Sequence, residues 1–175
     1  MTESYSKHIL SIMVDNEPGV LARVVGLFSG RGYNIESLSV SEVDSDKFLS
    51  RVTIVTSGTK IIVDQIKAQL KKLIPVHNLI DISELKSFIG KELILIKLNV
   101  KKKSVSKIYK FIKDYGAKIL FENKTEIIIQ YSGTPSEISL VIKKLRSYNI
   151  IELTRSGLVS MALGTEYIKK IRKIK

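Results

Sequence analysis

Residues 15–40 read DNEPGVLARVVGLFSGRGYNIESLSV, and this stretch determines how the first half of the chain folds. The apolar run at 9–14 just before it predicts a buried strand. Apolar residues then recur at i, i+3, i+4 and i+7, which predicts an amphipathic helix. These residues are Leu21, Val24, Val25 and Phe28. The glycines of the following GRG end the helix, and residues 35–43 predict a second strand.

The turn between the first strand and the helix has the composition of a small-anion site. Helix N-terminal amides lack intrahelical partners, so those of Gly19, Val20 and Leu21 should point outward at the positive end of the helix dipole. Asn16 is a candidate to cap the helix, and the intervening proline presets φ for its first turn. Each of these residues is also common in purely structural turns. The functional interpretation depends on their combination with Tyr33-Asn34-Ile35 at the far end of the helix.

The remaining elements repeat one order twice. In the first half, a polar turn at 44–47 precedes a strand at 48–56, a helix at 60–73 and a strand at 76–83. The second half has a strand at 93–100, a helix at 104–115, paired strands at 118–121 and 126–131, a helix at 136–145 and an extended strand at 150–163 that bends near Gly157. This repetition predicts an α+β fold of two ferredoxin-like βαββαβ sandwiches. We expect the first domain at 8–83, a linker at 84–90, the second domain at 91–163 and a basic tail at 164–175.

Composition narrows the class of function. The net charge of +12 arises from 23 lysines and only 6 arginines among 175 residues. Nucleic-acid recognition depends on the bidentate arginine fork, so we expect no nucleic-acid partner. No apolar run approaches the roughly 20 residues needed to cross a bilayer, and residues 1–8 lack the apolar core of a signal peptide. Together with the absence of cysteine, this predicts a cytoplasmic protein with no membrane partner.

The sequence carries no recognisable catalytic or metal-binding pattern. His8 and His77 each stand alone, without neighbouring ligand residues, so we expect no metal site. There is no cysteine nucleophile and no serine in a strand–turn–helix elbow. The GRG at 30–32 is not a dinucleotide fingerprint, because Ile35 stands where a third glycine is required. We therefore expect no catalytic residues on this chain.

Longer motifs resemble a known family. GLFSGRGYNIESL at 26–38 resembles the N-terminal ACT domain of the small regulatory subunit of acetolactate synthase, and later segments agree. These segments are LSRVTI at 49–54, ELILIK at 92–97 and RSGLV at 155–159, whereas the resemblance is looser across 101–149. It implies a noncatalytic subunit of branched-chain amino acid biosynthesis that activates a catalytic large subunit and confers feedback inhibition by valine. It also implies that thiamine diphosphate, Mg²⁺ and FAD belong to that catalytic partner.

The length of the predicted helix implies that the effector site is shared between two chains. Gly19 and Asn34 lie at opposite ends of a predicted helix, whose dozen residues rise about 18 Å. One amino acid cannot bridge that distance, so the two residues can contact one effector only as members of different subunits in an isologous homodimer. The ACT resemblance implies the same arrangement.

The predicted effector-binding residues are Asn16, Gly19, Val20, Leu21, Asn34 and Ile35, of which the last two come from the partner subunit. Amides after the proline would bind the effector's carboxylate, with Gly19 allowing close backbone approach. The two asparagines would accept hydrogen bonds from its ammonium group, and the three apolar residues would surround a small branched side chain. The residues alone leave leucine and isoleucine open beside valine, because one methylene discriminates by about 1–3 kcal/mol.

Two other functions share parts of this pattern. An ACT-type amino-acid sensor could serve another enzyme or a transcriptional system, although the chain has no helix-turn-helix pattern, and ELILIK and RSGLV favour the acetolactate synthase family. An RNA-recognition motif has the same βαββαβ order, but it stacks bases on aromatic residues of its central strands. The predicted strands at 48–54 and 126–130 lack that aromatic pattern.

Overall fold

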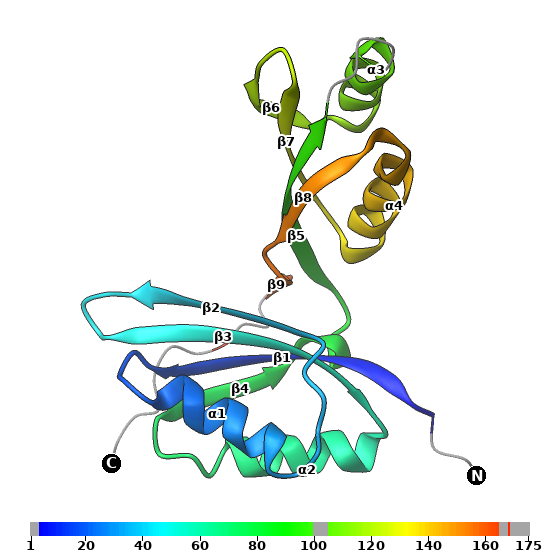
Figure 1. Ribbon diagram of the computed structural model, residues 1–175. Helices are drawn as coiled ribbons and strands as arrows, with labels where there is room; N and C mark the ends of the chain where they lie inside the picture. The colour runs from blue at the N-terminus through cyan, green and yellow to red at the C-terminus, as the bar shows by residue number, and fades with distance from the viewer. Residues whose placement is uncertain (1–3, 100–104, 165–167, 169–175) are drawn as a thin grey trace. The chain divides into compact units, whose positions relative to one another are not determined.

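The structure is a computed structural model that describes residues 4–99, 105–164 and 168. It forms two compact units (Figure 1): one contains the residues up to Ile89 and those from Leu158 onward, and the other is Gly90–Gly157. Each unit is a βαββαβ sandwich, which confirms the predicted α+β fold. No helix in the described ranges is long and apolar enough to span a lipid bilayer. Most of the predicted basic tail lies outside these ranges.

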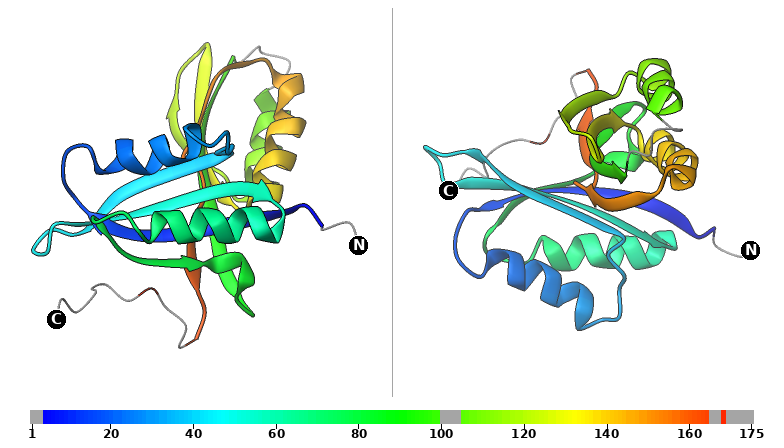
Figure 2. Two further views of the ribbon diagram at one scale, coloured as in Figure 1. Left: turned by 90° about the horizontal axis from the view of Figure 1, so that it is seen from below. Right: turned by 45° about the horizontal axis from the view of Figure 1, so that its top comes forward.

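The first unit is a four-stranded antiparallel sheet with two helices on one face (Figures 1 and 2). Its elements are β1 (Ser6–Asp15), α1 (Val20–Ser29), β2 (Ser37–Asp44), β3 (Leu49–Gly58), α2 (Lys60–Leu70) and β4 (Val76–Asp81). The strand order is β2-β3-β1-β4, so the longest strands are central and β2 lies at an edge. The β1–β3 register pairs Leu10 with Ile54 and Ile12 with Val52. These four side chains are buried in one core together with residues of both helices.

The buried face of α1 contains Val24 and Phe28 as predicted, but it begins at Val20 and not at Leu21. Val20, Val24 and Phe28 are buried, whereas Leu21 is 40% exposed. The stripe that packs on the sheet therefore follows i, i+4 and i+8, which fits a helical period as well as the predicted set does. The sequence contains both apolar stripes, and contact with the sheet selects the one that begins at Val20.

The end of α1 explains the glycine at position 32. Gly32 has φ +70°, its amide donates to the carbonyl of Ser29, and the Tyr33 amide donates to that of Phe28. This is the Schellman pattern, in which a left-handed residue satisfies the last carbonyls of a helix. The Tyr33 ring also meets the Phe28 ring edge-on, with centroids 6.3 Å apart. The residues before Asn34 are thus fixed by the helix itself.

The second unit repeats the architecture around a separate core. Its elements are β5 (Phe88–Asn99), α3 (Val105–Tyr115), β6 (Lys118–Glu122), β7 (Glu126–Gly133), α4 (Pro135–Leu145) and β8 (Ile150–Arg155), with the order β6-β7-β5-β8. Short 3-10 turns occur at η1 (Ile82–Glu84) and η2 (Arg146–Tyr148). Strand β5 starts at Phe88, inside the segment that we expected to be a linker.

The predicted strand at 150–163 is two strands rather than one. β8 stops at Arg155 and β9 (Val159–Ala162) starts after a break in which Gly157 has φ +78°. Beyond the break, Leu158 packs with Ile9, Val55 and Ile82 of the first unit. The second unit therefore ends at Gly157, before the boundary at 163 that the strand pattern suggested, because Leu158 belongs to an apolar cluster of the first.

Candidate effector site

The helix N-terminus that the sequence singled out is open in the structure. Gly19 is the N-cap residue of α1 with φ +83°, no side chain caps the helix, and no acidic residue occupies its first turn. The Val20 amide donates to the carbonyl of Glu17 at 3.3 Å, so it is not unpaired as predicted. Within the described ranges, the amides of Gly19 and Leu21 donate to no main-chain carbonyl. The helix thus presents donors and the positive end of its dipole to an anion.

Asn16 does not cap the helix, contrary to the prediction. Its main-chain amide donates to the carbonyl of Phe48 at 2.6 Å, and its side-chain Nδ2 donates to Oε2 of Glu42 at 2.9 Å. These bonds attach the turn before α1 to the β2–β3 hairpin. They also place the Glu42 carboxylate beside the turn, where it is an acceptor suited to an ammonium group.

Glu42 is a candidate site residue that sequence reasoning missed. It lies 26 positions from Asn16, and no local spacing relates the two. The β2–β3 register brings them together, because Glu42 pairs with Ser50 next to the bulge at the end of the hairpin. Only strand pairing carries this information, and the sequence pattern does not specify register to one residue.

At the opposite end of α1, Asn34 and Ile35 connect the helix to β2. The main-chain carbonyl of Asn34 accepts a 2.7 Å hydrogen bond from the Thr56 hydroxyl, while its side chain is exposed. Ile35 is half-buried and packs against the first core. The ten residues of α1 correspond to about 15 Å of rise, so one chain does not bring Asn34 together with Gly19.

The predicted apolar lining is only partly available. Val20 is 5% exposed and belongs to the core, so its side chain cannot surround a ligand. Leu21 is exposed beside the open amides and is free to do so. The candidate site in one chain therefore consists of the main-chain amides of Gly19 and Leu21, the Leu21 side chain, Asn16 and Glu42.

A separate apolar cavity of about 280 Å³ in the first unit does not coincide with this site. Met13, Arg51, Ile80 and Met161 are among its lining residues. Among the described residues that line it, Arg51 alone is charged, and burial lowers the pKa of this guanidinium. One cation suits a carboxylate, but the described lining offers no carboxylate for the ammonium group of an amino acid, whereas Glu42 lies beside the helix N-terminus.

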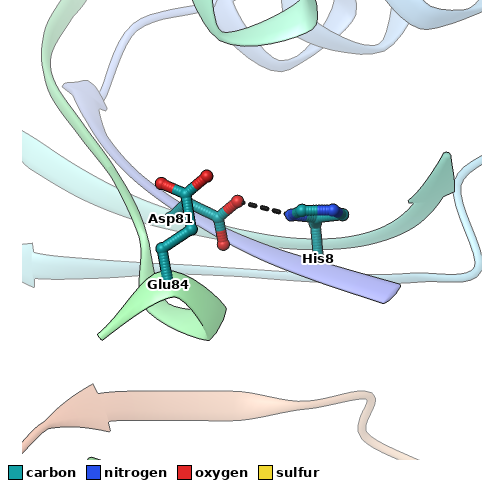
Figure 3. A group of neighbouring side chains, drawn as sticks. All are labelled: His8, Asp81 and Glu84. Atoms are coloured by element: carbon teal, nitrogen blue, oxygen red, sulfur yellow. Dashed lines mark hydrogen bonds and ion pairs between the residues drawn. The ribbon is translucent and has the colours of Figure 1, made fainter. Parts of the chain in front are cut away.

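The prediction that both histidines stand alone is wrong. His8 Nδ1 lies 2.7 Å from Oδ2 of Asp81, and both side chains are buried (Figure 3). His77 Nε2 contacts Oδ1 of Asp15. Neither carboxylate is near its histidine in sequence, because the pairs form between neighbouring strands or strand ends.

These features define the first unit as an ACT-type domain: a βαββαβ sandwich whose first helix presents an open, glycine-containing N-terminus. Residues 10–78 match the model of the "AHAS small subunit-like ACT domain", and residues 91–164 match that of the "Small subunit of acetolactate synthase". The acetolactate synthase small subunit of Buchnera aphidicola (subsp. Baizongia pistaciae) is 41% identical over 157 residues, which cover 89% of this chain and 98% of the relative.

A second relative and a solved structure agree over the same length. The small subunit from Mycolicibacterium smegmatis is 37% identical over 164 residues, covering 94% of this chain and 95% of that one. The crystal structure of the small subunit from Thermotoga maritima aligns with a TM-score of 0.85 at 30% identity, over 92% of this chain and 99% of that one. The chain belongs to the family of acetolactate synthase small subunits, as the resemblance of its motifs indicated.

Proposed function

We propose that this chain is a noncatalytic regulatory subunit of acetolactate synthase that binds valine. The open N-terminus of α1 carries the proposal, because it offers paired acceptor and donor groups for both ends of an amino acid. The amides of Gly19 and Leu21 suit the carboxylate, and Glu42 with Asn16 suits the ammonium group. Membership of the small-subunit family supports a separate catalytic large subunit as the partner. Thiamine diphosphate, Mg²⁺ and FAD would be bound by that partner.

The position of β2 supports a homodimer in which two such sites are completed. β2 is the edge strand of its sheet, and among the described strands it pairs only with β3. Asn34 lies in the short segment that leads into β2, and Glu42, which contacts Asn16, lies near the end of the strand. If β2 of two chains pairs antiparallel about a two-fold axis, the start of one strand lies beside the end of the other. The partner's Asn34 then approaches the turn that contains Asn16 and Gly19.

Titration into the catalytic large subunit tests the regulatory role. We expect the purified chain alone to form no acetolactate, to raise the rate of the catalytic subunit, and to make that rate sensitive to valine. An unchanged rate with valine still bound would instead indicate an amino-acid sensor for another system.

A mixing experiment tests whether the site is shared. Gly19→Asp and Asn34→Ala chains each form homodimers in which both sites are damaged. A heterodimer of the two has one site with both changes and one intact site, since Gly19 and Asn34 come from different chains. We therefore expect tandem-tagged heterodimers to bind one valine per dimer with the wild-type affinity. If the heterodimers bind no valine with the wild-type affinity, the shared arrangement is excluded.

A further inference from the structure

Three metal-binding groups converge at one corner of the first unit. They are His8 of β1, Asp81 at the end of β4 and Glu84 of η1 (Figure 3). One donor atom from each lies within 4.8 Å of the other two, and the structure holds no second group of this kind in the part of the chain that it describes. The side chains of His8 and Asp81 are 9% and 0% exposed, whereas that of Glu84 is 46% exposed.

Outer hydrogen bonds orient the two buried donors. Oδ1 of Asp81 accepts from the amide of Ser83 at 3.1 Å and from its hydroxyl at 2.6 Å, which directs Oδ2 toward Nδ1 of His8. On the far side of the ring, Nε2 of His8 lies 2.9 Å from the Ser6 hydroxyl. Metal-binding histidines and carboxylates characteristically have such second partners, which fix the direction of the ligand atoms.

The corner is open to solvent on one side. His8 and Glu84 line a polar hollow of about 650 Å³, which has room for the water molecules that complete a coordination sphere. A cation already lies at its rim, because Nζ of Lys67 contacts Oε1 of Glu84 at 2.9 Å. Lys67 also pairs with Asp64 at 2.8 Å, so it keeps a carboxylate partner if Glu84 turns to another cation.

We propose that His8, Asp81 and Glu84 bind a divalent transition-metal ion of the Zn²⁺ type, with water in the remaining position. An imidazole nitrogen with two carboxylates suits Zn²⁺, whereas Ca²⁺ and Mg²⁺ prefer oxygen ligands alone. The two carboxylates balance the charge of the ion. Bound there, it joins β1 to the end of β4.

The chain contains its own control. His77 and Asp15 form a second histidine–carboxylate pair, partly exposed, which belongs to no such group of three among the described residues. If the metal binds wherever a histidine lies beside a carboxylate, its affinity should depend equally on the His8–Asp81 pair and on the His77–Asp15 pair. A metal held by the three-residue corner depends on Glu84 and Asp81 and is indifferent to Asp15.

The test uses the full chain, freed of metal with a chelator, and titrates Zn²⁺ by calorimetry and Co²⁺ by visible absorption. We expect one Zn²⁺ per chain, at least tenfold weaker binding in Glu84→Gln and in Asp81→Asn, and unchanged affinity in Asp15→Asn. Glu84→Gln is the decisive variant, because its exposed side chain can change without disturbing the core. Zn²⁺ should also raise the melting temperature of the wild-type chain more than that of Glu84→Gln.

Three outcomes would overturn the proposal: no stoichiometric Zn²⁺ binding by the wild-type chain, equal affinity in Glu84→Gln, or a loss of binding in Asp15→Asn. Valine titration of the same samples separates this question from the proposed regulatory function. The metal-binding residues contribute nothing to the turn at Gly19, so either proposal can fail while the other holds.

Discussion

Helices α1 and α4 begin in opposite ways, although each belongs to a sandwich of the same topology. α4 has a complete capping box: the Glu137 amide donates to the Thr134 hydroxyl, the Thr134 amide donates to the Glu137 carboxylate, and Pro135 occupies the first turn. α1 begins at Gly19 with no side-chain cap and no acidic residue in its first turn. The second unit supplies its own carboxylate at the N-terminus of α4, while the first unit places none at the N-terminus of α1, where we propose that the effector's carboxylate binds.

A carboxylate side chain at residue 19 would give α1 what α4 already has, an acidic group of its own at the helix N-terminus. Gly19→Asp puts a negative charge where the proposed site would bind the effector's carboxylate, and two like charges at about 4 Å repel by roughly 4 kcal/mol at an effective dielectric of 20. This corresponds to about thousandfold weaker valine binding. Calorimetric titration of valine into the purified chain measures it.

Gly19→Asn is the matched control for that change. Gly19 has φ +83°, so either side chain is strained, and Asn and Asp tolerate this conformation better than other residues. No atom lies within 4 Å of the added Cβ, so neither variant meets a clash there. We expect Asn to retain much more valine affinity than Asp. Equal affinities in the two variants would show that the carboxylate binds elsewhere.

Removing only the charge of Glu42 should have a smaller effect. Glu42→Gln keeps the size of the side chain and can still accept a hydrogen bond from Asn16, but it loses the charge that pairs with an ammonium group. A hydrogen bond to a charged group contributes about 1.5–3 kcal/mol, so valine affinity should fall roughly tenfold to a hundredfold. Glu152→Gln, in an exposed ion pair of the second unit, should leave valine binding unchanged. Equal losses in both would indicate a nonspecific charge effect.

Removing the cap of α4 should lower the stability of the protein and leave valine binding unchanged. Thr134→Ala removes the side chain that caps α4 and should cost about 1 kcal/mol of unfolding free energy. Thr59→Ala at the N-cap of α2 is the control, because the Thr59 side chain makes no capping hydrogen bond and should cost less. Urea denaturation followed by circular dichroism measures both. A loss of unfolding free energy in Thr59→Ala as large as that in Thr134→Ala would contradict a stabilising role for the capping box of α4.

The smallest expected effect is on how the stability of the protein depends on pH. Hydrogen bonds from the main chain and side chain of Thr134 lower the pKa of Glu137, with a further contribution from Lys91. The stabilisation is therefore complete above the unfolded pKa of about 4.3 and is lost as the pH falls through the lower folded pKa. Urea midpoints of wild type and Glu137→Gln should differ at pH 6 and converge toward pH 3. Parallel curves over that range would show that the carboxylate charge does not stabilise α4.

Elements that depend on local periodicity could be predicted from the sequence, whereas side-chain contacts that depend on strand register could not. Helix α1, its glycine C-terminus and the exposed amides at Gly19 follow from neighbouring residues, so pattern alone located them. Glu42 beside Asn16 and Asp81 beside His8 require pairing between strands, which residue spacing does not encode. The choice of Val20 over Leu21 for the core likewise depends on how α1 rests on the sheet.

The break at Gly157 has a consequence for synthesis of the chain. The cluster of Ile9, Val55 and Ile82 is completed by Leu158, and Arg51 donates a 2.8 Å hydrogen bond to the carbonyl of Ser160. Leu158 and Ser160 are translated only after the whole of Gly90–Gly157. At about 5–20 residues per second, the nascent first unit waits several seconds with that apolar patch uncovered. The second unit, in contrast, is contiguous and has all of its residues as soon as it emerges.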